Sequence, residues 1–334
     1  MNGLSQLSSG ERIKAMPTSR RKVQNLQASA VDDVLEPAPR ADTVHHSIAR
    51  HADRGPWPYA ASLIRRSGFR DALRAYCAAV IERPAMAWPA DKFFGQRLRY
   101  LVSFSLIGLD ARWRRGDGEA PTLAALQRIA SASARQIAEL VSTLKLSGYV
   151  VASRLLADRR ALRLSPSMAL LQEIGRSPLA FLEASELLDP AESAVAAKLR
   201  SDPVGLADWL GASYEMFLQE DLYFAPFENV VEFTGQDCGY PVLCTALAAH
   251  YSGLAGVPVP APLTYRGLAE RFKVSGQHVG NILASAERRG CFSVDRGGRN
   301  VIVSAEFLSE FETWAAGQMA HYRLLAEPEF KIHS

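Results

Sequence analysis

The sequence predicts a mainly α-helical protein with two small β-hairpins, organised as two repeats. Three observations lead to this prediction. Apolar residues recur at three- and four-residue steps over much of the chain, a helix–helix–hairpin pattern occurs twice, and the second pattern matches the first in the order and spacing of its elements. The 334 residues suffice for about two domains. We therefore divide the chain into an N-terminal tail, residues 1–55, and two repeats, residues 56–190 and 191–334.

The tail is polar and shows no sustained apolar period, so we expect it to be flexible. It contains a basic triplet, Arg20 to Lys22, and three histidines, His45, His46 and His51. The histidines show no recognisable metal-ligand spacing and no nearby thiol. We interpret these residues as solvated, and we expect no metal and no cofactor in the protein.

Helical periodicity begins after the tail and returns in the same order in the second repeat. Gly68 interrupts the first helical stretch, which therefore predicts either one helix or two shorter ones. In the first repeat we expect helices over 59–82, 94–114, 122–130 and 133–147, followed by strands over 149–154 and 160–165. In the second repeat we expect helices over 204–219, 240–254, 264–273 and 275–289, strands over 291–295 and 299–303, and a long amphipathic helix over 305–325.

The two patterns align without a gap when Thr122 is placed on Thr264. The same alignment places Ser133 on Ser275 and ends with Gly148 on Gly290. Thr and Ser are preferred caps at helix N-termini, and Gly readily adopts the left-handed conformation that ends a helix. An internal duplication explains this correspondence.

In each pattern the second helix has one apolar and one polar face. In the first copy we expect Ile137, Leu140, Val141 and Leu144 to be buried, and in the second Val279, Ile282, Leu283 and Ala286. The opposite face of the first copy carries Arg135, Gln136, Glu139, Ser142, Thr143 and Lys145. The corresponding face of the second copy carries Gln277, His278, Asn281, Ser285 and Arg288.

A helix, a short turn, a second helix and a β-hairpin, in this order, define the winged helix-turn-helix. Its second helix fits the major groove of DNA, about 12 Å wide, where amide, hydroxyl and guanidinium groups read base edges. The hairpin, or wing, can place arginines beside phosphates. The first wing carries Arg159 and Arg160, and the second carries Arg296 and Arg299. We align Arg299 with Arg160 and expect the second wing to be about three residues shorter.

The Asp158-Arg159-Arg160 sequence, followed by alternating apolar residues and a Ser-Pro helix start, resembles the MarR family of bacterial transcriptional regulators over residues 95–177. The resemblance implies DNA-binding roles for Arg135, Gln136, Arg159, Arg160, Gln277, His278, Arg296 and Arg299. Members of that family usually carry one winged helix per chain and form homodimers. This chain has two, so the resemblance implies a pseudo-dimer within one chain, in which the remaining helices form the shared core.

Positive charge is concentrated at the two patterns, although the chain as a whole has a net charge of only +3. Residues 121–165 carry seven Lys or Arg and two Asp or Glu, a net charge of +5, and residues 263–304 carry seven and three, a net charge of +4. The segment between Arg200 and Arg266 has no Lys or Arg and eight acidic residues. Two basic windows in a nearly neutral chain are typical of nucleic-acid binding.

The sequence shows no phosphate-binding glycine loop, nucleophile elbow, zinc-protease motif or EF-hand loop, so we expect no enzymatic activity. It also lacks a long apolar segment and a secretory signal, so we expect a cytoplasmic, nucleoid-associated protein without a membrane partner. We expect the five tryptophans to fill the helical core, and Cys291 to be a small buried residue.

These observations favour a transcriptional regulator that binds double-stranded DNA in a sequence-specific way. Two alternatives remain open at this stage: a plasmid or phage replication initiator with tandem winged helices, and a winged-helix scaffold for protein interactions. The sequence leaves open the target DNA, a small-molecule effector and self-association through exposed helices.

Overall fold

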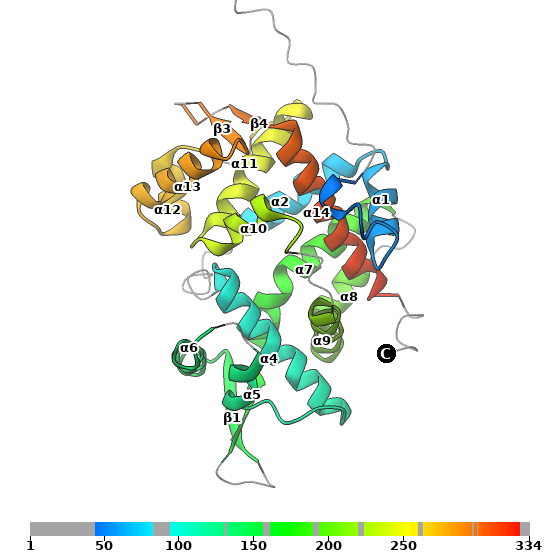
Figure 1. Cartoon of the computed structure of the whole chain (residues 1–334), viewed down its shortest axis with the longest axis vertical. Helices are drawn as coiled ribbons and strands as arrows, with labels where there is room; N and C mark the ends of the chain where they lie inside the picture. The colour runs from blue at the N-terminus through cyan, green and yellow to red at the C-terminus, as the bar shows by residue number, and fades with distance from the viewer. Residues whose placement is uncertain are drawn as a thin grey trace, which may run out of the picture. The chain divides into compact units, whose positions relative to one another are not determined.

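The computed structural model describes residues 44–82, 94–129, 132–155, 161–189, 194–219, 224–259, 263–295, 297–298 and 300–327. Residues Arg40–Ser334 form one compact unit. It is mainly helical, and its described residues include two antiparallel hairpins of two strands each, as the sequence predicts (Figure 1). None of its described helices is both long and apolar enough to cross a membrane.

The structure corrects the predicted extent of the tail. Residues 44–55 pack against the folded unit: Ile48 is fully buried, and the backbone N–H of His45 donates to Thr313 Oγ1 at 2.8 Å. A single 3₁₀ turn, His46–Ile48, forms there. A turn this short carries no periodicity, and its partner lies 268 residues away in the sequence, so the pattern could not reveal it.

Before the first hairpin pattern, the described residues include the helices α1 (Trp57–Ile64), α2 (Phe69–Ile81) and α4 (Arg97–Arg115). The predicted stretch 59–82 is two helices, because Gly68 adopts a left-handed conformation with φ of 85° between them. Gly116, with φ of 82°, is the residue at which α4 ends.

Two short helices and a hairpin follow. They are α5 (Leu123–Ile129), α6 (Ala134–Leu146), β1 (Val150–Arg154) and β2 (Leu162–Pro166). The two strands pair antiparallel, from Val150 opposite Pro166 to Arg154 opposite Leu162. All four elements lie close to their predicted ranges.

The described residues in the middle of the chain include two helices that the sequence pattern does not predict. The elements are α7 (Met168–Leu188), α8 (Val195–Ser201), α9 (Pro203–Gln219), α10 (Glu228–Gly235) and α11 (Gly239–Leu254). The unpredicted ones are α8 and α10, of seven and eight residues. Helices this short are marginal on their own, so tertiary contacts decide whether they form. For α7, the Ser-Pro sequence predicts only the start.

The second hairpin pattern resembles the first in its order of elements. It consists of α12 (Tyr265–Phe272), α13 (Gly276–Arg288), β3 (Phe292–Val294) and β4 (Val301–Val303), followed by the long α14 (Ala305–Leu324). β3 and β4 are antiparallel, from Phe292 opposite Val303 to Val294 opposite Val301.

The two predicted repeats exchange helices in the core. The most extensive helix contacts are α2 from the first repeat on α11 from the second, and α9 from the second repeat on α4 from the first. The first of these contacts includes a hydrogen bond between the hydroxyls of Tyr76 and Tyr240. The second is close enough that Gly108 of α4 lies directly against the ring of Tyr214 of α9. Neither repeat therefore contains a complete core of its own.

α7 and α14 pack against each other between these exchanged pairs. The ring of Phe181 on α7 lies 5.5 Å from that of Trp314 and 6.2 Å from that of Tyr322, both on α14. Trp57, Trp209 and Trp314 are buried, as predicted for core residues. Trp113 is half-buried, and Trp88 lies outside the described residues.

Candidate nucleic-acid interface

We define the first hairpin segment as residues 121–167 and the second as residues 263–304. The two segments start their helices with the same hydrogen bonds at equivalent positions. At the first helix of each segment, Thr122 Oγ1 accepts from Ala125 N and Thr264 Oγ1 accepts from Gly267 N, both at 3.1 Å. At the second helix, Ser133 Oγ accepts from Gln136 N at 3.3 Å and Ser275 Oγ accepts from His278 N at 3.1 Å. The predicted caps are confirmed, and equivalent residues therefore set the turn between the two helices in both segments.

The ends of the second helices also correspond. Gly148 and Gly290 have φ of 74° and 68°, as expected for residues that end a helix. The next residue then bonds back into the helix: Tyr149 N donates to Leu144 O, and Cys291 N to Ala286 O, both at 2.9 Å.

The hairpins close on equivalent backbone bonds, but they differ in length. Ser167 N donates to Tyr149 O at 2.9 Å, and Ser304 N donates to Cys291 O at 3.0 Å. Counted between these closing residues, the second wing is five residues shorter than the first. This corrects the predicted difference of about three, because sequence alone did not fix the register of the short strands. The predicted alignment of Arg299 with Arg160 concerns two residues that lie outside the described part of the chain.

The exposed face of α6 consists largely of the residues predicted for it. Ile137, Val141 and Leu144 are buried, whereas Leu140, predicted to be buried, is half-buried. On the other face Arg135, Gln136, Glu139, Ser142 and Lys145 are exposed, and Thr143 is half-buried. Arg135 is 88% exposed and pairs with Glu139 one turn on, with 2.8 Å between Nε and Oε1. An exposed pair of this kind stabilises the helix weakly, so the guanidinium can exchange it for another anion.

Two candidate residues of α6 have local hydrogen bonds. The side-chain amide oxygen of Gln136 accepts hydrogen bonds from the backbone N–H of Ser133 at 3.1 Å and from the Ser133 hydroxyl at 2.9 Å. Together with the Ser133 cap, the backbone bond forms a capping box. The hydroxyl of Thr143 donates to the carbonyl of Glu139 at 2.9 Å. The amide nitrogen of Gln136 remains available as a donor, but its oxygen is held at the cap.

The candidates on α13 divide into exposed and anchored residues. Gln277, Asn281 and Arg288 are exposed, and Gln277 Nε2 donates to Asn281 Oδ1 at 2.9 Å. Ser285 and His278 are half-buried. His278 Nε2 lies 2.7 Å from the carbonyl oxygen of Asp237, in the turn between α10 and α11. The imidazole of His278 therefore anchors the start of α13 to the helical core.

The four predicted wing arginines, Arg159, Arg160, Arg296 and Arg299, lie outside the described residues. Arg163 on β2, opposite Ser153 of β1, is described. Its guanidinium stacks over the ring of Trp113 at 4.0 Å, with Nη2 3.8 Å from Asp110 Oδ1. Burial raises the pKa of Asp110, although the arginines at 114 and 163 oppose this shift. Arg163 therefore fixes the hairpin to α4.

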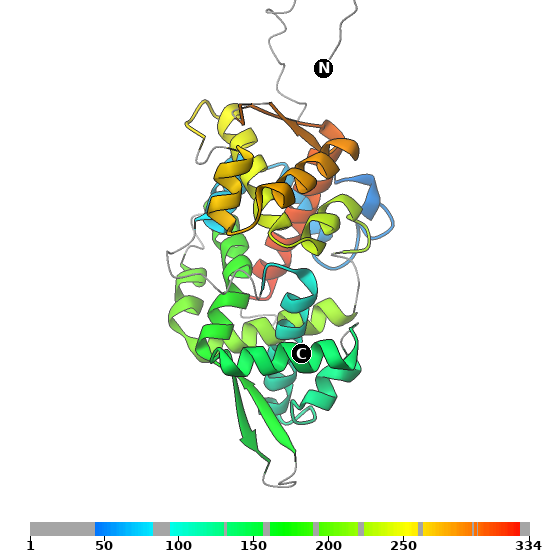
Figure 2. The same cartoon turned by 90° about the vertical axis from the view of Figure 1, so that its left-hand side faces the viewer.

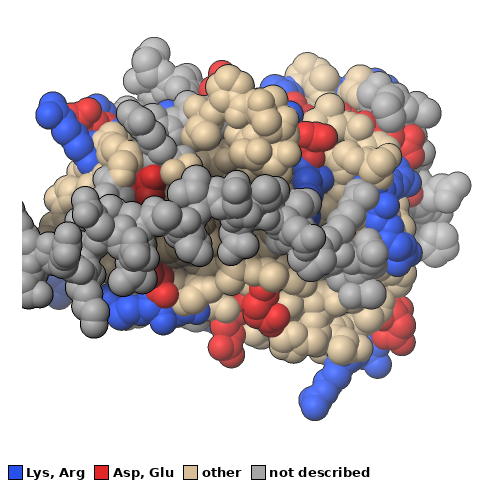
Figure 3. Space-filling view, turned by 90° about the horizontal axis from the view of Figure 1, so that it is seen from above, with Lys and Arg blue, Asp and Glu red and all other residues tan. Residues whose placement is uncertain are grey.

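Both hairpin segments lie on one side of the molecule. Figure 1 shows the helices of both segments on its left side, α12 and α13 above α5 and α6. In Figure 2 the same two helix pairs lie on the face turned to the viewer, again with α12 and α13 above. The two hairpins lie at opposite ends of this face, β1–β2 at the bottom and β3–β4 across the top. Seen from above in Figure 3, Lys and Arg alternate with Asp and Glu along the edges, so the charge pattern is mixed on that side.

Sequence reasoning missed exposed residues around the second segment. Tyr265, the first residue of α12, is 55% exposed, and a groove between α12 and α13 runs beside it, past Arg266 and Gln277 to Asn281. Arg266 is 88% exposed and pairs with Glu270 at 2.8 Å. The helical spacing gave no signal for this exposure, since Tyr265 precedes the buried Leu268 by three residues, which places both on one face of the helix.

One cluster among the described residues has the donor atoms of a metal site. His45, His46 and Glu306 place their ligand atoms within 4.8 Å of one another. However, His45 Nδ1 accepts a hydrogen bond from Ser47 N at 3.2 Å, and its Nε2 lies 2.9 Å from Glu306 Oε1. The geometry is that of a hydrogen-bonded pair.

Comparison of the chain with protein-family models, with curated proteins and with solved structures found no match. The assignment of a function therefore depends on the geometry described above.

Proposed function

We propose that the chain binds double-stranded DNA with two winged helix-turn-helix modules, the first and the second hairpin segment, and that it acts as a sequence-specific transcriptional regulator. The observation that carries the proposal is the repetition of caps, turn and hairpin closure in two segments that share one face. The MarR-like features of residues 95–177 support the same function. The modules and the helices around them form a pseudo-dimer within one chain.

In this proposal α6 and α13 enter two successive major grooves, about one DNA turn or 34 Å apart. The hairpins, which lie at opposite ends of the face, flank them and contact the DNA backbone. The two reading helices present unlike side chains, Arg135 and Glu139 on α6 against Gln277 and Asn281 on α13. The preferred DNA site is therefore asymmetric, with two different half-sites, and binds one chain.

The first test measures the salt dependence of DNA binding for two matched variants. Arg135→Gln removes an exposed guanidinium from α6, and the control Arg200→Gln removes one from α8 that also pairs with a glutamate. If Arg135 contacts a phosphate, the variant releases about one counterion fewer, and the slope of log K against log salt falls by roughly 0.9. The control keeps the slope of the unmodified chain. Equal slopes for all three proteins would remove Arg135 from the phosphate contacts.

The second test selects bound sequences from random DNA. Gln277→Ala should relax the base preference in one half-site alone, since a good bidentate base contact contributes roughly 1–3 kcal/mol of discrimination. The mass of the complex in light scattering should correspond to one chain per selected site. A palindromic selected site bound by two chains would refute the pseudo-dimer. Binding of equal strength to all DNA would refute sequence-specific regulation, and no DNA binding at low salt would favour the protein scaffold.

A further inference from the structure

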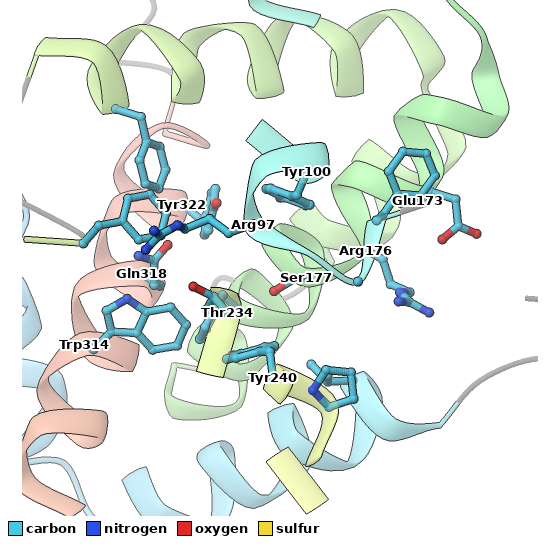
Figure 4. A pocket seen from close by; sticks show the side chains of 17 residues that line it. Arg97, Tyr100, Glu173, Arg176, Ser177, Thr234, Tyr240, Trp314, Gln318 and Tyr322 are labelled. Carbon is cyan, nitrogen blue, oxygen red and sulfur yellow. The ribbon is translucent and has the colours of Figure 1, made fainter. Parts of the chain in front are cut away.

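A cluster of two histidines and one glutamate lies at the start of α14. His45 and His46 come from the residues that precede α1, and Glu306 belongs to the first turn of α14. Their donor atoms lie within 4.8 Å of one another. None of the three lines the aromatic cavity inside the core, whose wall includes Tyr240 and Trp314 (Figure 4). The cluster is therefore separate from that cavity and from the helix faces proposed to read DNA.

The spacing of the donor atoms is close to the spacing around a bound metal ion. His45 Nε2 lies 2.9 Å and His46 Nδ1 lies 3.5 Å from Oε1 of Glu306. A tetrahedral Zn²⁺ ion with nitrogen and oxygen ligands at about 2.0–2.1 Å holds these ligand atoms roughly 3.3–3.4 Å apart. The two observed distances fall on either side of this value. Small rotations of the exposed His46 and Glu306 side chains therefore bring all three atoms onto one ion.

The buried ligand of the cluster, His45, is held in place by the fold. Its backbone N–H donates to Thr313 Oγ1 of α14 at 2.8 Å, and the residue is 7% exposed. In this structure its Nδ1 accepts a hydrogen bond from Ser47 N at 3.2 Å. When Nε2 binds a metal, the ring proton lies on Nδ1, and the Ser47 hydroxyl, 2.9 Å from that nitrogen, accepts it. Ser47 thus provides the hydrogen-bond partner that orients a metal-binding imidazole.

The other two ligands are open to solvent. The side chains of His46 and Glu306 are 78% and 70% exposed, so a metal ion can enter and water can complete its coordination. Imidazole and carboxylate are common ligands of Zn²⁺. A glutamate in the first turn of a helix also stabilises the helix by its charge alone. That role requires no histidine beside the carboxylate, whereas a metal site requires both.

We propose that His45, His46 and Glu306 bind one Zn²⁺ ion per chain, with water in the fourth position. The ion joins the start of the described chain to the first turn of α14, two residues after Ser304 closes the second hairpin. The spacing of the histidines predicted no metal, because the third ligand lies 261 residues from His45. The inference does not depend on DNA binding, since none of the three residues belongs to a hairpin segment.

Titration of Zn²⁺ into the full chain against a competing metal indicator measures affinity and stoichiometry. We expect one Zn²⁺ per chain at micromolar metal, and a rise in unfolding temperature that EDTA reverses. His46→Gln and Glu306→Gln each remove one ligand, so each should weaken binding by roughly tenfold or more, at least the effect of losing a hydrogen-bond partner of a ligand. The matched control is His51→Gln, in the same segment but outside the cluster, and it should bind as the unmodified chain does. The four cysteines are buried and do not compete for the metal.

Circular dichroism in EDTA shows whether each variant is folded before metal is added. Zn²⁺ binding of equal strength in all four proteins would overturn the site, and so would binding that is weakened as much by His51→Gln as by His46→Gln. Absence of binding to the unmodified chain at millimolar Zn²⁺ would do the same. These measurements contain no DNA, so their outcome is independent of the DNA-binding tests and either proposal can fail alone.

Discussion

The crossing of α4 and α9 can be tested with a single methyl group. A Cβ atom added to Gly108 would lie 1.9 Å from Cδ1 of Tyr214 and 2.6 Å from its Cγ. The Tyr214 ring cannot easily move away, because the residue is 5% exposed and the ring packs edge-on against Phe104 with 5.4 Å between centres. Gly108→Ala therefore forces the two helices apart.

The expected cost is the balance of two effects. Overpacking a core costs typically 1–3 kcal/mol, and the better helix propensity of alanine returns up to about 1 kcal/mol. The control is Gly253→Ala on α11, where a new Cβ meets no atom within 4 Å. The control should gain up to about 1 kcal/mol. The free energies of unfolding of the two variants should thus differ by roughly 1–3 kcal/mol, with Gly108→Ala the less stable.

Urea unfolding followed by circular dichroism measures this difference, and a double variant identifies its cause. Tyr214→Ala removes the ring that the new methyl group would meet. The double variant Gly108→Ala, Tyr214→Ala should therefore lose less stability than the sum of the two single variants, because contacting residues are not additive. If Gly108→Ala is as stable as Gly253→Ala, α4 and α9 do not cross at Gly108 and the exchanged core is wrong.

Two further predictions concern stability. Burial lowers the pKa of His321 from 6.5 to about 3, with its Nε2 2.8 Å from Ser213 Oγ, so the folded state keeps the ring neutral while the unfolded state takes up a proton near 6.5. The contribution of this residue to the free energy of unfolding is full above about pH 6.5 and falls by about 1.4 kcal/mol per pH unit below it. Urea unfolding at several pH values should show a smaller slope of unfolding free energy against pH for His321→Gln. An unchanged slope would contradict the assignment. Ser133→Ala and Ser275→Ala should each lower the free energy of unfolding by about 1 kcal/mol. Ser142→Ala, on the exposed face of α6, should change it by no more than about 0.5 kcal/mol. Similar unfolding midpoints for all three variants would contradict the capping roles.

Local signals in the sequence predicted the elements that depend on local interactions. Thr264, Ser275 and Gly290 mark the starts and the end of α12 and α13, because a cap or a left-handed glycine acts within a few residues. The sequence pattern missed helices α8 and α10. It also gave the wrong boundary for the tail, at residues 44–55, and the wrong length for the second wing. Each of these depends on contacts distant in the sequence, which periodicity does not contain.

The candidate interface shows the same division. The exposed faces of α6 and α13 followed from helical spacing, since it separates buried from exposed positions. The anchoring of His278 did not, because its partner Asp237 lies 41 residues earlier in the sequence. The aromatic cavity was also invisible, since no short segment contains more than a few of its wall residues. The DNA-binding roles of all these residues remain predictions.

The exchange of α2 and α9 between the halves has a consequence for how the molecule stays assembled. When two separate chains exchange helices, dilution separates them. Here one chain supplies both halves, so the second half is present at a fixed effective concentration whatever the concentration of the protein. The unfolding temperature should not depend on protein concentration. In a homodimer a substitution appears in both subunits. In this chain it changes one half of the molecule alone, so the two halves can diverge in evolution.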